Sequence, residues 1–182
     1  LTGDLSAILL ENAMPLVNFL RVPSKKVALM NEWESKIQAI IDNTEHVNVT
    51  SLSGVPSWFL TLIKNMLHKT GKKNLLEIWP NLEVFFHGGV GFGPYREDYK
   101  ELIPNDKMFY VETYNASEGF FGIQNDQSDS SMLLMIDLGI FFEFIPMTVF
   151  GTEAQYTVPL WEVETEKNYA LVISTNSGLW RY

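Results

Sequence analysis

The chain has 182 residues, of which 46% are hydrophobic and 19% charged, a composition that supports a packed core and argues against disorder. Its formal net charge of −9, with no block of basic residues to offset it, disfavours nucleic acid or an anionic membrane as a partner. The absence of cysteine excludes disulfides and thiolate chemistry and fits a reducing cytoplasm, and no apolar run reaches the ~18 residues of a membrane-spanning helix.

The first half of the chain predicts helices that alternate with short strands. We expect helices over 5–20, 27–42, 57–67 and 94–102 and strands over 47–52, 82–86 and 108–112. Asp4 is a candidate cap for the first helix, and Pro15 interrupts it. Pro56 and Gly71 are typical residues for the start and the end of the third helix. The apolar run 82–86 indicates a strand buried on both faces, and the alternation predicts a largely parallel sheet.

After Tyr114 the predicted strands follow one another more closely, which favours an antiparallel or mixed sheet. They are expected over 120–123, 132–136, 140–145, 160–163 and 169–174. Residues 137–139 are expected to form a turn. Residues 174–182 predict a hairpin, with a polar turn and a second, aromatic strand.

Together these patterns predict an α/β protein, with a mixed sheet and flanking helices that lead into a second, more antiparallel β-rich half. We expect 1–182 to be a single incomplete domain, because the chain stops directly after a strand-like run. Its αβαβ part is expected over 1–113 and its β-rich part over 114–182.

Four glycines fall within six positions, 88–93, after the strand predicted over 82–86. Glycine lets a backbone approach a ligand closely or adopt positive φ, and ligands of open α/β sheets bind at the carboxyl ends of strands. The segment lacks the Gly-Lys-Ser/Thr ending of a phosphate-binding P-loop and does not match the dinucleotide spacing. A tight turn without a ligand explains the pattern equally well.

A second polar segment, 112–119, follows the next predicted strand. It combines an aromatic ring, a hydroxyl and a carboxylate at Tyr114, Ser117 and Glu118. A nucleotide site needs these groups: a flat ring for the base, a hydroxyl for a phosphate oxygen and a carboxylate for Mg²⁺. A solvated polar loop is the alternative interpretation of this segment.

In this order, the segments resemble the auxin-responsive acyl-acid amido synthetases, a branch of the adenylate-forming superfamily, and most closely its non-plant members. Residues 114–118 (Tyr-Asn-Ala-Ser-Glu) match the family's Tyr-x-x-Ser-Glu nucleotide motif. Residues 79–83 running into 87–90 are similar to its adenosine-side strand and loop, and 53–58 to its helix start. Residues 178–182 resemble the run that leads to the family's ribose-binding aspartate.

The resemblance implies a ligase that uses ATP and Mg²⁺ to adenylate a carboxylic acid and then joins the acid to an amino acid. It implies that Tyr114 packs on adenine, that Ser117 bonds an α-phosphate oxygen and that Glu118 holds Mg²⁺. The other nucleotide-side residues implied are Gly88, Gly89, Val90, Asn115 and Ala116. The residues implied for the acyl pocket are Val55, Trp58, Phe120 and Phe121, although aromatic residues of this kind more often belong to a core.

Two parts of the family's pattern are missing from the sequence. The Ser/Thr/Gly-rich phosphate loop would precede Leu1, and the ribose-binding aspartate and the mobile C-terminal subdomain would follow Tyr182. We therefore expect the chain to be a central fragment, one wall of an active site, that is inactive on its own and binds ATP weakly or not at all.

Two other functions remain open: an acyl-CoA ligase of the same superfamily, and a non-catalytic module that binds a sugar or a peptide through aromatic residues. The aromatic residues in question are Phe141, Phe142, Phe144, Tyr156 and Trp161. We expect them to form a core, because the neighbours Phe141 and Phe142 point to opposite faces of a strand. A serine hydrolase and a histidine zinc site are disfavoured, since the chain has three histidines at no metal-binding spacing and no Gly-x-Ser-x-Gly sequence.

Overall fold

The computed structural model describes residue 8 and residues 10–182. The expected cap Asp4 and the first turn of the helix expected over 5–20 lie outside these residues. The chain divides into two compact units. The first unit contains the residues up to Ser117 together with 122–133, and the second contains 118–121 together with 134–182.

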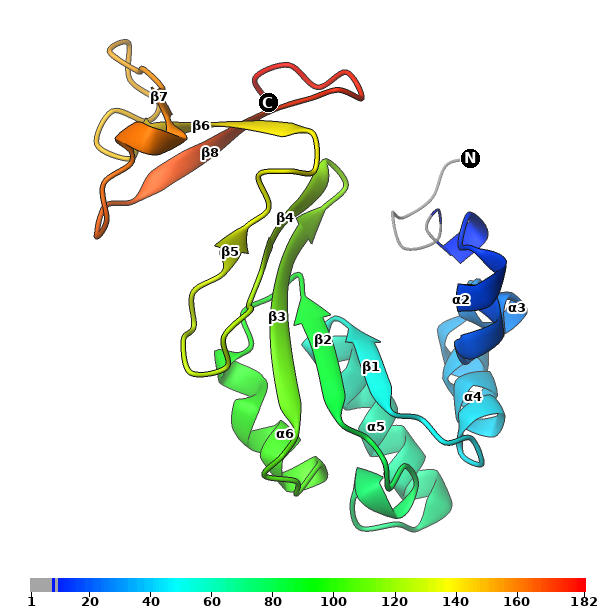
Figure 1. Ribbon diagram of the computed structural model, residues 1–182. Coiled ribbons are helices and arrows are strands. Elements are labelled where there is room, and N and C mark those ends of the chain that lie inside the picture. Colours follow the sequence, from blue (N-terminus) through cyan, green and yellow to red (C-terminus); the bar gives the residue numbers. More distant parts are fainter. Residues whose placement is uncertain (1–7, 9) are drawn as a thin grey trace. The chain divides into compact units, whose positions relative to one another are not determined.

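The first unit is built on three parallel strands, which lie side by side in Figure 1. The strands are β1 (Ser51–Gly54), β2 (Val84–Gly88) and β3 (Phe109–Ala116). They belong to a five-stranded sheet of order β1-β2-β3-β4-β5, whose last strands are β4 (Gly119–Ile123) and β5 (Leu133–Leu134). The parallel arrangement expected from the alternation of helices and strands is confirmed.

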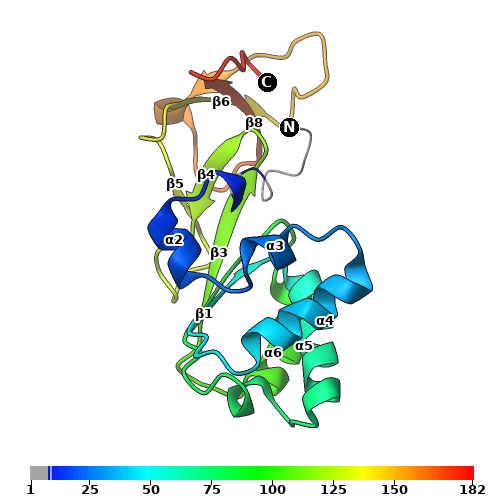
Figure 2. The same cartoon turned by 90° about the vertical axis from the view of Figure 1, so that its right-hand side faces the viewer.

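Helices α4, α5 and α6 lie on one side of β1 and β3 (Figure 2). The described α-helices are α2 (Pro15–Leu20), α3 (Lys25–Ala28), α4 (Trp33–Thr44), α5 (Pro56–Thr70) and α6 (Arg96–Leu102), and the 3₁₀ helices η1 (Leu75–Glu77) and η2 (Gly93–Tyr95) precede β2 and α6. Both ends of α5 are as predicted, with Pro56 in the first turn and Gly71 in the left-handed conformation, φ 68°, at the C-cap. Pro15 likewise begins α2.

The prediction of one helix over 27–42 is wrong, because the chain breaks between α3 and α4. The Glu32 carboxylate accepts hydrogen bonds from the backbone N–H groups of Glu34, at 3.0 Å, and Ser35, at 2.6 Å. These bonds satisfy the free donors at the start of α4, so Glu32 acts as an N-cap. The pattern of apolar residues continues across this break and does not reveal it.

The strand boundaries of the first unit also differ from the prediction. Strand β1 starts at Ser51, later than the expected start at residue 47. Strand β2 starts at Val84 and not at residue 82, because Leu82 lies in a preceding turn, where its N–H donates to the Trp79 carbonyl at 3.2 Å. Strand β2 is buried on one face only, since Phe86 is 39% exposed. Strand β3 runs on to Ala116, so that 114–116 is strand and not loop.

The core of the first unit lies between the sheet and α5 and α6. Phe85 and Tyr99 are fully buried and their rings stack at 5.2 Å. The Tyr99 hydroxyl donates to the Pro56 carbonyl at 2.8 Å, which ties α6 to the start of α5. The buried Trp79 indole N–H donates to the Thr44 carbonyl, also at 2.8 Å, and so ties the segment before β2 to the end of α4.

The second unit contains a three-stranded sheet of order β7-β6-β8. Its strands are antiparallel, one of the two arrangements, antiparallel or mixed, expected from the sequence. Its strands are β6 (Ile140–Pro146), β7 (Val158–Pro159) and β8 (Tyr169–Thr175). The turn at 137–139 is confirmed, with Gly139 at φ 74°. The strand expected over 160–163 is wrong: the segment forms a 3₁₀ helix, η3 (Leu160–Glu162), after Pro159, which cannot donate to a strand ladder.

The expected hairpin at the end of the chain forms. The backbones of Ile173 and Tyr182 exchange two hydrogen bonds of 2.9 Å. Arg181 has a left-handed backbone, φ 46°, which interrupts the returning segment, so the structure contains no regular second strand there. The Arg181 guanidinium instead lies 3.3 Å from the Glu143 carboxylate and donates to the Thr157 hydroxyl at 3.0 Å.

The expectation that the aromatic residues of the β-rich half form a core is only partly correct. Phe142 is buried and Phe144 half-buried, but Phe141, Tyr156 and Trp161 are exposed. The last two lie outside the strands, where the alternation of strand faces does not govern burial.

We expect Gly71→Ala to lower the free energy of unfolding by about 1 kcal/mol, because an L-residue is strained at the left-handed C-cap. No heavy atom lies within 4 Å of the added methyl group, so the effect would come from the backbone alone. Urea unfolding followed by circular dichroism measures it. Gly91→Ala is the matched control, since that position is equally open and lacks positive φ. Equal losses in the two variants would contradict the strain argument.

Candidate functional site

The three parallel strands of the first unit end at the same edge of the sheet. Gly54 of β1 pairs with His87 of β2, and Gly88 of β2 pairs with Thr113 of β3. The start of α5, the glycine turn (residues 88–91) and the end of β3 therefore lie at this edge, as Figure 1 shows. Carboxyl ends of parallel strands are where open α/β sheets bind ligands.

Gly88 is required by the packing of β2 against β3. A Cβ atom on Gly88 would lie 2.8 Å from the Thr113 hydroxyl and closer still to the Thr113 carbonyl oxygen. The Thr113 hydroxyl donates to the His87 carbonyl at 3.0 Å and fixes this approach. Gly89 has φ 82°, a conformation that favours glycine, and a Cβ there would lie 3.4 Å from the Val55 side chain. The turn is thus tightly built even without a ligand.

The residues of the Tyr-x-x-Ser-Glu motif divide between the end of β3 and the turn that follows it. Tyr114, at 50%, and Asn115 are both exposed and, as strand neighbours, point to opposite faces of the sheet. Ser117 and Glu118 form the two-residue connection between β3 and β4. Ser117 is exposed and belongs to the first unit, whereas Glu118 is half-buried and belongs to the second.

The four residues implied for an acyl pocket lie in different surroundings. Val55 lies beside Gly89, whereas the Trp58 ring makes an edge-to-face contact with Trp33 of α4 at 5.3 Å and is 62% exposed. In the second unit Phe120 is half-buried, and Phe121 is buried and lies 6.4 Å from the ring of Phe142.

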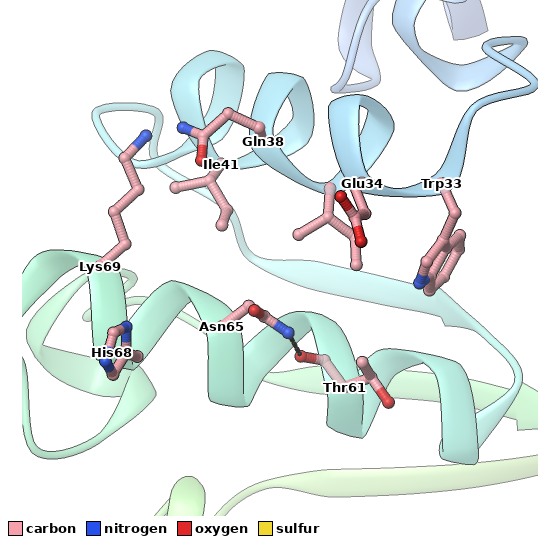
Figure 3. Close-up of a pocket in the computed structure, with 9 residues that line it drawn as sticks. Trp33, Glu34, Gln38, Ile41, Thr61, Asn65, His68 and Lys69 are labelled. Atoms are coloured by element: carbon pink, nitrogen blue, oxygen red, sulfur yellow. Dashed lines mark hydrogen bonds between the residues drawn. The ribbon is translucent and has the colours of Figure 1, made fainter.

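A groove between α4 and α5, with a volume of about 560 Å³, was not foreseen from the sequence (Figure 3). Its lining combines polar and apolar side chains from the two helices: Trp33, Glu34, Ile37, Gln38, Ile41, Thr61, Asn65, His68 and Lys69. Lys69 lies at one end of the groove (Figure 3) and forms an ion pair with Asp42. The two walls are far apart in the sequence, and the periodicity of each helix gave no sign that they leave a hollow between them.

His87 is a further residue that the sequence analysis did not single out. It is only 2% exposed, its ring stacks on Phe92 at 4.2 Å, and its Nδ1 has no hydrogen-bond partner among the described residues. Burial, together with the nearby Arg96 guanidinium, lowers the pKa of His87 to about 4. The alternation with Phe85 in β2 was the available signal that this side chain points into the core.

Tyr110 lies on the neighbouring strand and has a second buried polar atom without a partner in the described part of the chain, its hydroxyl. Its ring lies 5.0 Å from Phe92, on the face of the sheet that carries Phe85 and His87. Burial raises the pKa of Tyr110 to about 12, and the Arg96 charge opposes this rise. Phe92 is therefore in contact with two unsatisfied polar side chains.

Comparison with known domain families matches both halves of the chain. Residues 1–108 match the GH3 family N-terminal domain, and residues 133–182 match the GH3 family central domain. The chain belongs to the GH3 family. This confirms the resemblance drawn from the glycine turn and the Tyr-x-x-Ser-Glu motif.

Curated GH3 relatives include indole-3-acetic acid-amido synthetases of Arabidopsis thaliana. GH3.4 is 31% identical over 176 residues, which cover 85% of this chain and 29% of the relative. GH3.3 is 34% identical over 116 residues, which cover 59% of this chain and 19% of the relative. The chain thus spans less than a third of the length of these GH3 relatives.

Solved GH3 structures share the fold. The GH3.15 acyl acid amido synthetase superposes with a TM-score of 0.66 at 20% identity, over 92% of this chain and 39% of that one. A GH3.15 complex with 2,4-DB gives a TM-score of 0.59 at 18% identity, over 80% of this chain and 34% of that one.

The described part of this GH3 chain lacks two features, a membrane-spanning helix and a cluster of metal-binding side chains. No helix in it is both long and apolar enough to cross a bilayer. Its His, Asp and Glu side chains form no group of three or more that is placed to hold a metal ion.

We expect Gly88→Ala to lower the free energy of unfolding by about 1–3 kcal/mol, because the added methyl group meets backbone and hydroxyl atoms of Thr113 that cannot move far. Denaturant unfolding measures the loss, and amide NMR should show shifts at Thr113 and Asn115. Gly93→Ala serves as control, since open space surrounds that glycine. A Gly88→Ala variant as stable as the control would show that the two strand ends are not held together as described.

Proposed function

We propose that the protein containing this chain is an ATP-dependent acyl-acid amido synthetase, which adenylates a carboxylic acid and conjugates it to an amino acid. Two lines support the proposal: the activity in the names of its GH3 relatives, and the edge where the glycine turn and the end of β3 meet. The pairing of Gly88 with Thr113 is the observation on which the proposal depends most, because it brings both segments to one strand end. We assign the nucleotide side to the part over 1–113 and the Tyr-x-x-Ser-Glu motif to the part over 114–182.

The proposed reaction has two steps. In the first, the carboxylate of the acid attacks the α-phosphorus of ATP, and pyrophosphate leaves. In the second, an amine attacks the activated carbonyl, an amide bond forms, and AMP leaves. Neither step needs a protein nucleophile, so the protein would act by positioning the reactants and by neutralising phosphate charge.

The residues of the site have the right chemistry for ATP and Mg²⁺. The half-exposed Tyr114 ring offers a surface for adenine. The backbone of residues 88–90 can approach the adenosine closely, because Gly88 and Gly89 have no side chains to keep it away. Ser117 presents an exposed hydroxyl for a phosphate oxygen, with Asn115 and Ala116 between it and the ring. Glu118 supplies the hard carboxylate oxygen that Mg²⁺ prefers, and bound Mg²⁺ would neutralise charge on the phosphates.

The acyl pocket is proposed at the start of α5. Val55 lies next to Gly89, which supports its assignment, and Trp58 follows one turn later in the helix. Phe120 and Phe121, the other residues implied by the resemblance, belong to the second unit, and the burial of Phe121 against Phe142 leaves little of its ring for a substrate.

A non-catalytic binding module remains the alternative from another class. The exposure of Phe141, Tyr156 and Trp161 favours it. These residues come from a strand, a loop and a 3₁₀ helix, so they do not form the single flat sheet face that a sugar-binding or peptide-binding module would present. The ligase assignment accounts for the whole chain and is preferred.

We expect Glu118→Gln in the full-length protein to lower carboxylate-dependent ATP–pyrophosphate exchange by about 100-fold or more, because a neutral amide holds Mg²⁺ poorly and metal charge stabilises this step by several kcal/mol. Glu101→Gln, an exposed position on α6, is the matched control and should exchange normally. Unchanged exchange in Glu118→Gln at saturating Mg²⁺ would remove Glu118 from the mechanism.

The acceptor separates an amido synthetase from an acyl-CoA ligase, since both share the first step. Preformed acyl-adenylate, made from a panel of acids that includes indole-3-acetic acid, is offered either CoA or free amino acids. We expect mass spectrometry to detect the amide and no thioester. A thioester with CoA, and no amide, would identify the protein as a CoA ligase.

A further inference from the structure

The glycine turn is closed at its base by two stacked rings. Residues 88–91 carry three glycines and one valine, and they are flanked by His87 on one side and Phe92 on the other. The rings of His87 and Phe92 lie 4.2 Å apart with an angle of 24° between their planes. Both side chains are 2% exposed. The stack therefore joins the two ends of the turn inside the core of the first unit.

We propose that His87 is a positioning residue for nucleotide binding: its uncharged imidazole, stacked on Phe92, holds the Gly88–Gly91 turn in the conformation that receives the adenosine. This inference rests on the proposed function. His87 does not touch the nucleotide in this proposal and acts only through the backbone of the turn.

The surroundings of the stack require a neutral imidazole. Phe92 packs against Tyr99 at 5.3 Å and Tyr110 at 5.0 Å, and the Arg96 guanidinium lies over the Phe92 ring at 5.2 Å. Arg96 thus makes a favourable cation–π contact with Phe92 and would repel a charged His87 imidazole. His87 Nδ1 has no hydrogen-bond partner among the described residues, so nothing there would accept a hydrogen bond from a proton on this atom.

The titratable groups around the stack come from few elements. Strand β3 brings Tyr110 and Glu112, which is paired with His87 in the register, and η2 with α6 brings Tyr95, Arg96 and Tyr99. Strand β1 places Gly54 opposite His87 and adds no charge, and α5 contributes Phe59, which packs on Phe85. Glu112 is the one carboxylate among these groups, and it is half-buried on the neighbouring strand.

The sign of the pH dependence follows from the lowered pKa. The pKa of His87 is about 4 in the closed stack and near its ordinary value of 6.5 when the ring is released to water. The stack is therefore fully favoured above pH 6.5 and is lost as the pH falls from 6.5 toward 4. Between pH 7.5 and pH 5 linkage disfavours the closed stack by as much as about 30-fold.

The test measures the KM for ATP of the full-length protein by pyrophosphate exchange between pH 5 and pH 8. We expect the wild-type KM to rise toward pH 5, while kcat at saturating ATP changes less. His87→Phe keeps a stacking ring that cannot titrate, so it should keep the wild-type KM at pH 7.5 and lose the rise attributable to His87. His87→Ala should raise the KM about three- to tenfold already at pH 7.5, since the ring contact is lost.

Two further variants separate positioning from general damage. Phe92→Leu removes the stack from the other side and should raise the KM by a similar factor, and the double variant His87→Ala/Phe92→Leu should add little to either single change. His46→Gln, at an exposed histidine, should retain the wild-type pH profile. A wild-type KM in His87→Ala, or an unchanged pH profile in His87→Phe, would overturn the proposal.

A measurement made without nucleotide distinguishes two outcomes: that His87 does not position the turn, and that the protein is not a ligase. In the ¹⁵N-labelled 182-residue chain, the amide shifts of residues 88–91 should follow the titration of the His87 ring below pH 6 and should be flat in His87→Phe. If these amides follow His87 and no exchange activity exists, the stack stands and the ligase assignment fails. If exchange is robust while amides and KM ignore His87, the ligase stands and the positioning role fails.

Discussion

The close approach of β2 to β3 at Gly88 is the constraint on which the first unit's candidate site depends. Only a residue without a side chain lets the two backbones meet where the Thr113 hydroxyl bonds the His87 carbonyl. This contact sets where β2 ends, and so where the glycine turn begins. It also places Tyr114, the residue after Thr113, next to the start of the turn. A local packing requirement thus produces the geometry that the family resemblance assigns to nucleotide binding.

The same turn illustrates how a core and a site are built from one set of residues. Phe85, His87 and Phe92 belong to the aromatic core beneath the sheet, whereas the residues between His87 and Phe92 lie at the strand ends. Rigid aromatic packing beneath the glycine-rich segment limits the conformations that the segment can adopt. This arrangement explains why so many glycines can be tolerated in a turn proposed to hold a ligand.

The sequence predicted those features that are encoded locally. Proline and glycine at the two ends of α5 have strong conformational preferences, and the alternation of helices and strands implied the parallel sheet. The break before α4 was missed because Glu32 looks like any exposed helical glutamate until its carboxylate is seen to cap the next turn. The extent of β3 was missed because Tyr114 to Ala116 has polar residues that suit a loop as well as a strand end.

The site was predictable to the extent that it is carried by a contiguous motif. Residues 114–118 could be recognised as one string, whereas the ring stack of His87 and Phe92 joins residues five positions apart across an irregular turn, for which no periodic pattern exists. The α4–α5 groove escaped notice for a related reason, since lining residues such as Ile41 of α4 and Asn65 of α5 come together only in the folded chain. Pairings of this kind depend on tertiary packing.

The burial of Trp79 gives the first unit an intrinsic optical reporter. Of the five tryptophans, Trp79 alone is buried and hydrogen-bonded through its indole N–H, while the other four are exposed. Iodide or acrylamide at moderate concentration would quench the fluorescence of the exposed indoles first. The residual, blue-shifted emission would then follow the integrity of the contact between the end of α4 and the segment before β2, with no added label.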